Sequence, residues 1–425
     1  MIIRPKGTKD VIPAEVYKWQ IIENIAKRQL RTHGFNEIRT PSFEHTELFV
    51  RGVGEGSDIV NKEMYTFLDK GGRSITLKPE GTASIARAVV ENGLDNDAMP
   101  LKLYMLTPCF RYERPQAGRL REHHQFSIEA FGSESPLMDA EVISVVKSIL
   151  DEFEFDNYLI NINSIGCSEC RGKYVEALKN YYAKHIDSMC HDCKVRFEKN
   201  PLRLLDCKED SCKVFKNDAP KPIDFICDNC KNHFESLKQI LNSMDIKFAV
   251  NNNLVRGIDY YSRTVFEFLT QEKGALNVIC GGGRYDGLTG EIGGKNLPAV
   301  GVGLGIEHLL MLLEKNNKMS IFRDSNRVDV FLVCADTNYT LDVVRYAKYL
   351  RDNQVLVDYD TMGRSVKAQL KYANKINARS VIVLGGDEFA SKTCKIKIMS
   401  TGEEKVFTFD DIKNIRDTVK GFEWR

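Results

Sequence analysis

The hydrophobic residues near the amino terminus recur at helical spacing. One side of a helix with 3.6 residues per turn would carry Trp19, Ile22, Ile25, Ala26 and Leu30. Gly34 then provides a stop signal. The pattern predicts an amphipathic helix over residues 12–33, followed by a strand in "FNEIRTPSFE" and a Pro turn.

A two-residue alternation marks the next long segment. Residues 103–111 and 121–131 both alternate between apolar and polar, and the Pro-Gln-Ala-Gly stretch between them predicts an antiparallel hairpin. In the second strand, one face would carry His123, Gln125, Ser127 and Glu129. We expect this polar face to line a wet site or to meet solvent.

Further along, the pattern is interrupted and then resumes. Paired cysteines and Lys-rich helical segments occupy residues 165–245, after which strands return in "LVRGIDYYSRTVFEFLT" and "CGGGRYDGL". The chemistry-bearing part is therefore expected to be an α+β domain over residues 1–322, with an antiparallel sheet flanked by helices and a Cys-rich helical insertion at 165–245.

The last hundred residues follow a different rhythm. Apolar strands alternate with amphipathic helices over 328–335, 338–352, 355–360, 365–376 and 380–385. This alternation predicts a small α/β domain with a mostly parallel sheet, over residues 326–425.

Charge and hydropathy limit the function classes. The 425 residues carry 60 Lys and Arg against 59 Asp and Glu, so a polyanion would have to be met by local basic patches. The N-terminus lacks the apolar core of a signal peptide, and no stretch reaches the ~18–20 apolar residues that span a bilayer. We expect a soluble cytoplasmic protein without a membrane partner.

The chain has twelve cysteines, and eight of them fall within the insertion as four pairs. Such spacing suits a structural Zn²⁺ site that staples a small insert, although a cysteine can also simply be buried. Spacing alone does not choose the partners. The set put forward for a single site is Cys190, Cys193, Cys227 and Cys230.

Arginines gather in the hairpin loop, in "RYERPQAGRLREHHQF". Guanidinium forks suit phosphate oxygens, although a solvated hairpin tip would also carry such residues. Glu80, Thr82, Tyr260, Tyr261 and Tyr285 stand near turns and strand ends elsewhere. Acid, hydroxyl and aromatic groups together suit a zwitterionic small molecule that contains a ring.

These segments resemble a known family. "GFNEIRTPSFE", "PCFRYERPQAGRLREHHQFSIEAFG" and "VGVGLGIEHLL" are similar to motifs 1, 2 and 3 of the class II aminoacyl-tRNA synthetases. "LVRGIDYYSRTVFEF" and "GGGRYDGL" resemble the two signature segments of histidyl-tRNA synthetases. The resemblance runs from "RPKGTKD" to "GRSVKAQLKYANK" and is weakest in the insertion.

The resemblance implies a function and site residues. It implies activation of L-histidine with ATP, accompanied by Mg²⁺, and transfer of the histidine to tRNA(His). Arg111 and Arg256 would be catalytic, at the α-phosphate, and Arg119 and His308 would complete the ATP site. The histidine pocket would consist of Glu80, Thr82, Gln125, Glu129, Tyr260, Tyr261 and Tyr285.

The resemblance also implies contacts with tRNA and with a second copy of the chain. Arg114 and Gln116 would meet the acceptor end of tRNA(His), and Arg364 would lie in an anticodon-binding domain of α/β type. Motif 1 usually builds a dimer interface, so a homodimer is expected. The insertion would lie against the acceptor arm, and catalysis would not need its metal.

One departure keeps an alternative open. The family usually has arginine directly after the motif 3 glutamate, whereas this chain has His308. The alternative is a non-charging paralogue, such as a histidine or tRNA sensor or a regulatory subunit of ATP phosphoribosyltransferase. That subunit typically has eroded signatures, whereas Arg111, Arg256, Gln125 and Tyr261 are all present here.

Overall fold

The three-dimensional description rests on a computed structural model. It describes residues 1–54, 57, 59–114, 119–207, 209–256, 258, 260–270, 278–322 and 328–419. The chain separates into two compact units, Met1–Ile321 and Phe322–Arg425. In the described ranges, no helix combines the length and apolar character needed to cross a membrane.

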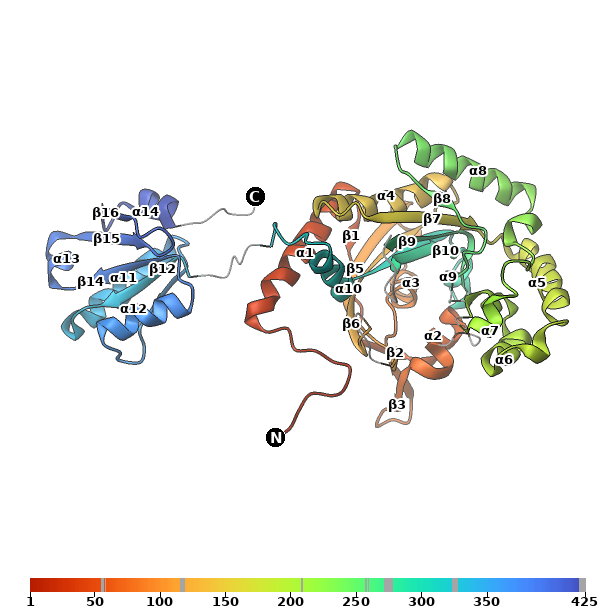
Figure 1. The fold of residues 1–425 in the computed structure, drawn as a ribbon, viewed down its shortest axis with the longest axis horizontal. Helices are drawn as coiled ribbons and strands as arrows, with labels where there is room; N and C mark the ends of the chain where they lie inside the picture. Colours follow the sequence, from red (N-terminus) through yellow and green to blue (C-terminus); the bar gives the residue numbers. More distant parts are fainter. Residues whose placement is uncertain are drawn as a thin grey trace. The chain divides into compact units, whose positions relative to one another are not determined.

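The first unit is built on a large sheet (Figure 1). Within the described residues it has eight strands, in the spatial order β1 (Asn36–Glu37), β5 (Leu101–Phe110), β6 (Glu122–Phe131), β11 (Ala299–Gly305), β10 (Val278–Arg284), β9 (Ser262–Thr270), β7 (Tyr158–Ser164) and β8 (Ala249–Val250). All neighbouring pairs are antiparallel except β1–β5 and β7–β8 at the two edges. The predicted antiparallel sheet is confirmed.

Helices cover both faces of this sheet. One face packs against α4 (Pro136–Glu152) and α10 (Ile306–Lys315), with α1 (Pro13–Thr32) and α8 (Asp228–Ser243) alongside. The other face meets α3 (Thr82–Glu91), which neighbours α2 (Thr46–Val53) and α9 (Leu288–Glu291). The helix predicted over residues 12–33 corresponds to α1, with Pro13 at its first turn.

The predicted hairpin is β5 and β6, and its alternation decides which side chains enter which layer. Phe126, Ile128 and Ala130 are at most 1% exposed and face α4 and α10. Ser127 and Glu129 lie on the α3 side, yet each is 0% exposed. The expected polar face therefore exists, but it is buried rather than open to solvent.

"FNEIRTPSFE" does not form one strand. Its start is the two-residue β1, and its end is β2 (Phe43–His45), which belongs to a separate sheet with the order β2, β4 (Ser74–Leu77), β3 (Tyr65–Leu68). Pro41 lies between the two strands, where its lack of an N–H suits a break in strand pairing.

The insertion is helical, as expected. After β7 the chain forms α5 (Ser168–Tyr182), α6 (His191–Lys199), α7 (Asp210–Lys213) and α8. Short turns join them at η3 (Ile186–Ser188), η4 (Pro201–Asp206) and η5 (Pro222–Phe225). Elsewhere in this unit, short helical turns lie at η1 (Ile59–Glu63) and η2 (Leu94–Asn96).

The second unit has the predicted alternation, with an addition. β12 (Val330–Cys334), α11 (Thr340–Asp352), β13 (Val357–Tyr359), α12 (Val366–Lys375) and β14 (Ser380–Leu384) follow in order, and the three strands are parallel. After α13 (Gly386–Ser391), β15 (Thr393–Ile398) and β16 (Glu404–Thr408) add an antiparallel edge. η6 (Thr337–Tyr339) and α14 (Ile412–Val419) complete the described part.

Candidate active site

Four glycines lie side by side on the α3 side of the large sheet. Gly301 and Gly303 of β11 pair with Glu129 and Ser127 of β6, and on the other side with Gly283 and Gly281 of β10. Because residues in register share a face, all four glycines lie on the side that carries the polar residues of β6. At these four positions, β10 and β11 therefore carry no side chains on this face of the sheet.

Neighbouring side chains fill the space above these glycines. A Cβ atom at residue 301 would overlap the carboxylate of Glu129, and one at residue 303 would lie 2.7 Å from the amide nitrogen of Gln125. At residue 281 it would overlap the guanidinium of Arg256. The glycines of "GGGR" lie inside β10, and Tyr285 directly follows this strand.

Glu129 lies at the centre of a buried hydrogen-bonded group. It accepts a hydrogen bond from the Thr82 hydroxyl at 2.6 Å and another from the Tyr285 hydroxyl. Burial raises the pKa of Glu129 to about 8, and the nearby Glu80 carboxylate adds to this effect. The two hydrogen bonds oppose the rise because they stabilise the ionised form.

Glu80 precedes α3 and holds its first turn. Its two carboxylate oxygens accept hydrogen bonds from the backbone N–H groups of Thr82 at 2.7 Å and Ala83 at 2.9 Å. These donors are among those that a helix leaves unpaired at its start. Burial raises the pKa of Glu80, while these hydrogen bonds and the charge of Arg111 lower it.

Three tyrosines form the wall beside these carboxylates. The ring of Tyr260 lies 4.8 Å from that of Tyr261 and 5.3 Å from that of Tyr285, between centroids. Burial raises the pKa of all three phenols. They therefore keep their O–H donors at neutral pH.

Two arginines lie near these residues. Arg256 lies over Gly281, 3.5 Å from the Glu267 carboxylate, with its guanidinium 6.0 Å from the centre of the Tyr261 ring. Arg111 donates from Nε to the Pro79 carbonyl at 2.8 Å, one residue before Glu80. The site thus combines buried carboxyls and phenols with two guanidinium groups, which suits an amino acid next to a phosphate.

The start of α10 contributes the residue that departs from the family motif. Glu307 accepts hydrogen bonds from the backbone N–H of His124 at 2.9 Å, which ties α10 to β6. His308 follows and is half-buried, and its buried Nε2 has no hydrogen-bond partner among the described residues. Burial lowers the pKa of His308, and the charge of Arg119 lowers it further.

The hairpin loop is only partly described. Arg119 pairs with Glu113 at 3.2 Å, and Arg114 is exposed. Arg121, which belongs to the same arginine-rich stretch, stacks on Tyr112 at 3.8 Å. Gln116, one of the residues expected to contact tRNA, lies outside the described residues.

A buried ion-pair network behind the site was not predicted. The Asp139 carboxylate lies 2.7 Å from Nε of Arg284 and 2.6 Å from Nε2 of His233, and it accepts from the Thr264 hydroxyl at 2.7 Å. Arg284 is 0% exposed and directly precedes Tyr285. The network joins α4, α8, β9 and β10. Its members are far apart in sequence, so no local pattern could have revealed it.

The cysteines of the insertion form two groups, each of which could hold a metal ion. The first cluster consists of Cys167, Cys170, Cys227 and Cys230, and the second cluster of Cys190, Cys193, Cys207 and Cys212. The expected set of Cys190, Cys193, Cys227 and Cys230 is therefore corrected. Its two halves lie in different clusters, because the path of the chain between the pairs brings α5 to α8 and α6 to α7.

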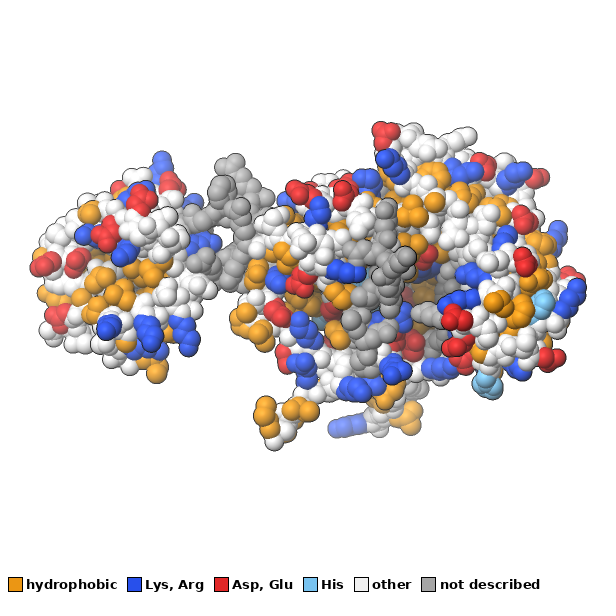
Figure 2. Space-filling model, in the orientation of Figure 1, with side chains coloured by type: hydrophobic (Ala, Val, Ile, Leu, Met, Phe, Trp, Pro, Cys, Tyr) orange, Lys and Arg blue, Asp and Glu red, His pale blue; other side chains and the backbone are white. Residues whose placement is uncertain are grey.

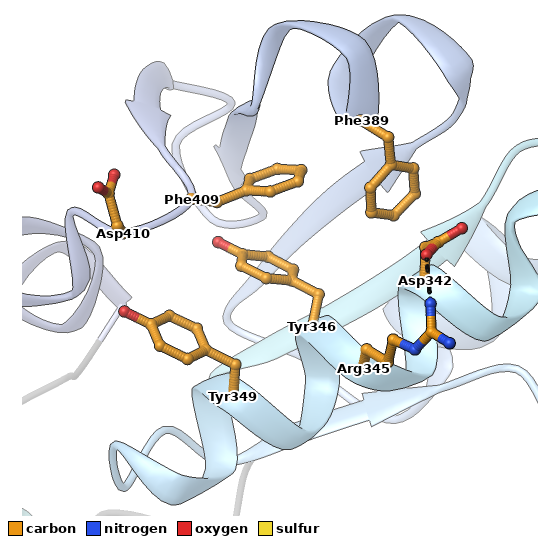
Figure 3. A pocket seen from close by; sticks show the side chains of 7 residues that line it. All are labelled: Asp342, Arg345, Tyr346, Tyr349, Phe389, Phe409 and Asp410. Carbon is orange, nitrogen blue, oxygen red and sulfur yellow. Dashed lines mark hydrogen bonds and ion pairs between the residues drawn. The ribbon is translucent and has the colours of Figure 1, made fainter.

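The second unit carries Arg364 and an open aromatic pocket. Arg364 pairs with Asp360 at 2.6 Å and stacks over Tyr372 at 4.3 Å. Elsewhere in the unit a pocket of about 390 Å³ is lined by Asp342, Arg345, Tyr346, Tyr349, Phe389, Phe409 and Asp410 (Figure 3). Its aromatic faces suit a planar group. On the face of both units shown in Figure 2, basic and acidic side chains are interspersed.

Comparison with known proteins agrees with this geometry. The family model described as histidyl-tRNA synthetase matches residues 7–309, and the one described as anticodon binding domain matches residues 329–416. A histidine–tRNA ligase of Caldanaerobacter subterraneus subsp. tengcongensis is 50% identical over 409 residues, covering 96% of this chain and 98% of that protein. That of Clostridium novyi is 49% identical over 415 residues, covering 98% of each.

A solved structure supports the same relationship. The apo histidyl-tRNA synthetase of S. aureus superimposes with a TM-score of 0.83 at 35% identity, covering 98% of this chain and 100% of that one. Both the sequence matches and this structural match extend through the insertion and the second unit. The chain therefore belongs to the histidyl-tRNA synthetase family.

Proposed function

We propose that this chain activates L-histidine with ATP and transfers it to tRNA(His), as a histidine–tRNA ligase. The observation that carries the proposal is the group of polar side chains that lies above Gly281, Gly301 and Gly303. It combines the buried Glu129 carboxyl, bonded to the Thr82 and Tyr285 hydroxyls, with the guanidinium groups of Arg256 and Arg111.

Histidine recognition falls to the buried group. Glu80 receives the α-ammonium, since its carboxylate has lone pairs beyond those used by the start of α3. Glu129 and Tyr261 lie on either side of the imidazole. These two side chains are oriented by Thr82, Gln125, Tyr260 and Tyr285. A site with buried donors and acceptors rejects an apolar side chain of similar size, because its own polar groups would be left unpaired.

Adenylate formation follows from charge and position. A carboxylate oxygen of histidine attacks the α-phosphorus of ATP, a new P–O bond forms, and the bond to pyrophosphate breaks. Arg111 and Arg256 stabilise the negative charge that develops, with no covalent nucleophile from the protein. Arg119 and His308 contact the remainder of ATP, and Mg²⁺ accompanies the nucleotide phosphates.

The transfer step uses the rest of the chain. A ribose hydroxyl at the end of tRNA attacks the histidyl carbonyl, an ester bond forms, and AMP leaves. Arg114 and Gln116 contact the acceptor end. We assign residues 1–322 to the catalytic domain, 165–245 to its insertion, and 326–425 with Arg364 to anticodon binding.

Assembly and metal binding complete the proposal. Phe43 and Phe67 are 56% and 48% exposed on one face of the three-stranded sheet, and exposed apolar residues of this kind fit a homodimer interface. Structural Zn²⁺ in the cysteine clusters staples the insertion. The enzyme works in the cytoplasm.

ATP–pyrophosphate exchange with histidine tests the proposal. Exchange that depends on histidine, together with histidine-dependent charging of tRNA(His), is expected. Histidine binding without exchange would instead support a non-charging sensor or a regulatory subunit of ATP phosphoribosyltransferase. Sedimentation of the full chain would test the dimer separately.

A further inference from the structure

The sulfur positions in the insertion have the spacing of metal ligands. Cys167 and Cys170 have their sulfurs 3.5 Å apart, and those of Cys170 and Cys230 are 3.9 Å apart. In the second cluster, the sulfurs of Cys190 and Cys207 are 3.8 Å apart. Tetrahedral Zn²⁺ with Zn–S bonds of about 2.3 Å requires sulfurs about 3.8 Å apart, whereas a disulfide requires about 2 Å.

Backbone N–H groups also point at a sulfur in each cluster. The N–H of Cys227 donates to the Cys170 sulfur at 3.0 Å, and the N–H of Cys190 donates to the Cys212 sulfur at 3.2 Å. Cys167, Cys190 and Cys227 each directly precede a helix. Positive helix ends and N–H donors stabilise the anionic sulfur that zinc binds.

The first cluster lies where the insertion leaves the large sheet, next to the tyrosine wall. Gly166 accepts from the backbone N–H of Arg263 at 2.8 Å, and the N–H of Ile165 donates to the Arg263 carbonyl at 2.8 Å. These bonds extend the pairing of β7 with β9 up to Cys167. Arg171, directly after Cys170, donates from its guanidinium to the Tyr261 carbonyl at 2.8 Å.

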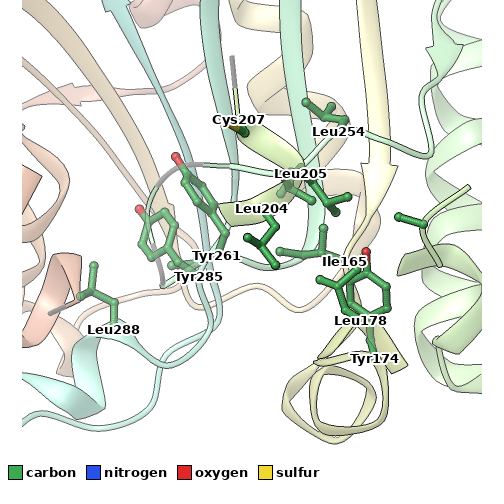
Figure 4. Close-up of a cluster of buried hydrophobic side chains, with 14 of the residues drawn as sticks. Ile165, Tyr174, Leu178, Leu204, Leu205, Cys207, Leu254, Tyr261, Tyr285 and Leu288 are labelled. Atoms are coloured by element: carbon green, nitrogen blue, oxygen red, sulfur yellow. The ribbon is translucent and has the colours of Figure 1, made fainter. Parts of the chain in front are cut away.

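Hydrophobic packing also links α5 to the same wall through a shared cluster. Tyr174 and Leu178 of α5 belong to one buried cluster with Ile165, Tyr261 and Tyr285, as Figure 4 shows. Each of these side chains is at most 6% exposed. A shift of the first turn of α5 would therefore reach Tyr261 through both the Arg171 hydrogen bond and this packing.

We propose that the two clusters bind one Zn²⁺ each, and that the ion in the first cluster positions Tyr261 through Arg171. Arg171 is a positioning residue, because it contacts the Tyr261 backbone and not the substrate. The inference rests on the proposed role of Tyr261 in the histidine pocket. It replaces the expectation that the metal would matter only for the insertion.

Metal analysis of the full chain tests whether each cluster binds one Zn²⁺. Protein purified without chelator should hold two Zn²⁺ per chain, and Cys230→Ser and Cys193→Ser should each retain one. Cys334→Ser, in the second unit, should keep both. Absence of zinc, an iron–sulfur chromophore, or disulfides in place of free thiols in the purified protein would overturn the assignment.

Histidine affinity tests the proposed link between the first cluster and Tyr261. Cys230→Ser and Arg171→Met should weaken histidine binding roughly fivefold, with the KM for ATP within twofold of the parent value. Arg171→Met should keep two Zn²⁺, so it remains informative even where Cys230→Ser fails to fold. Lys173→Met is the control, because it also removes one positive charge from the same helix, but at an exposed position.

Failure of this inference can be distinguished from failure of the proposed ligase function. Unchanged histidine affinity in Arg171→Met, or equal weakening in Lys173→Met, would overturn the link to Tyr261. A parent protein that holds two Zn²⁺ but lacks histidine-dependent exchange would refute the ligase activity and leave the metal assignment standing.

Discussion

The carboxylate of Glu129 occupies the space that a side chain at residue 301 would fill. Gly301 lies opposite Glu129 in the register of β11 and β6, and a Cβ atom there would overlap Oε2. This relationship explains a feature of the sequence that local propensity opposes, because glycine weakens a central strand. In "GGGR" and "VGVGLG", alternate glycines leave room for polar side chains from neighbouring segments.

Gly281→Ala should therefore remove activity without unfolding the protein. The new methyl group would overlap the Arg256 guanidinium and displace it, so we expect histidine-dependent exchange to fall by at least ~100-fold, or ~2.7 kcal/mol of barrier. Steady-state exchange kinetics and thermal unfolding measure the two effects. Gly172→Ala, with nothing within 4 Å of its Cβ, is the control and should leave activity unchanged.

Arg256→Ala should act on the chemical step more than on histidine binding. Its guanidinium is assigned to the α-phosphate, and removing one such preorganised donor typically costs about 2.7–4 kcal/mol. We expect kcat for exchange to fall roughly 10²–10³-fold, with the histidine dissociation constant within threefold. Exchange kinetics and calorimetric titration provide the measurements. Near-normal exchange in a folded Arg256→Ala protein would refute the assignment.

The pH dependence of histidine binding should follow Glu129. Its pKa of about 8 means that the empty pocket holds mostly neutral carboxyl at pH 7, whereas an ionised carboxylate accepts a stronger hydrogen bond from an imidazole N–H. Histidine affinity should rise roughly fivefold from pH 7 to pH 8, because the ionised fraction grows by that factor. Glu129→Gln should bind more weakly and show no such rise. A flat profile in the parent protein would contradict the role.

The same pKa has a consequence for stability without substrate. Between the unfolded value of 4.5 and about 8, the folded state binds more protons at this residue than the unfolded state does. The contribution of Glu129 to the free energy of unfolding is therefore largest below pH 4.5 and declines as pH rises through this window. Denaturant melts of the parent protein and Glu129→Gln across pH 5–8 would isolate it.

His308→Arg should strengthen ATP binding. Burial and Arg119 lower the pKa of His308, so the imidazole is neutral at pH 7 and offers the phosphates no charge. A guanidinium there should lower the KM for ATP about tenfold, equivalent to ~1.4 kcal/mol, and leave the KM for histidine unchanged. His308→Gln, which stays neutral, is the matched control. An unchanged or raised KM for ATP would mean that another cation already serves the phosphates.

Hydrophobic periodicity was sufficient to predict an element where that element buries one face against a single layer of the fold. It located α1, the β5–β6 hairpin and the alternation of β12 to β14, because their apolar residues lie on a single face. It failed at β1 and β2, where pairing in two different sheets divides one strand-like segment. It also missed the β15–β16 edge.

Within the site, the residue types were readable but their environment was not. The alternation in β6 placed Gln125, Ser127 and Glu129 on one face, yet solvent exposure depends on what covers that face. Glu129 is fully buried between these layers, and this burial raises its pKa although the hydrogen bonds from Thr82 and Tyr285 oppose the rise. Burial is a property of the assembled layers, so no window of sequence contains it.

The sequence by itself determined the first helix, the hairpin and its polar face, the strand–helix alternation of the second unit, the arginine-rich loop and the presence of an insertion with metal-binding spacing. Only the tertiary structure decided which cysteines share a cluster, which side chains fill the space above Gly281, Gly301 and Gly303, and that Arg171 reaches the Tyr261 carbonyl. The physical reason is the separation along the chain over which each effect acts. Strand and helix periodicities act between residues a few positions apart, whereas the contacts above the glycines join residues 25 positions apart (Arg256 and Gly281) to 178 positions apart (Gln125 and Gly303). Arg171 lies 90 positions from Tyr261, and only the fold of the whole sheet brings these segments together.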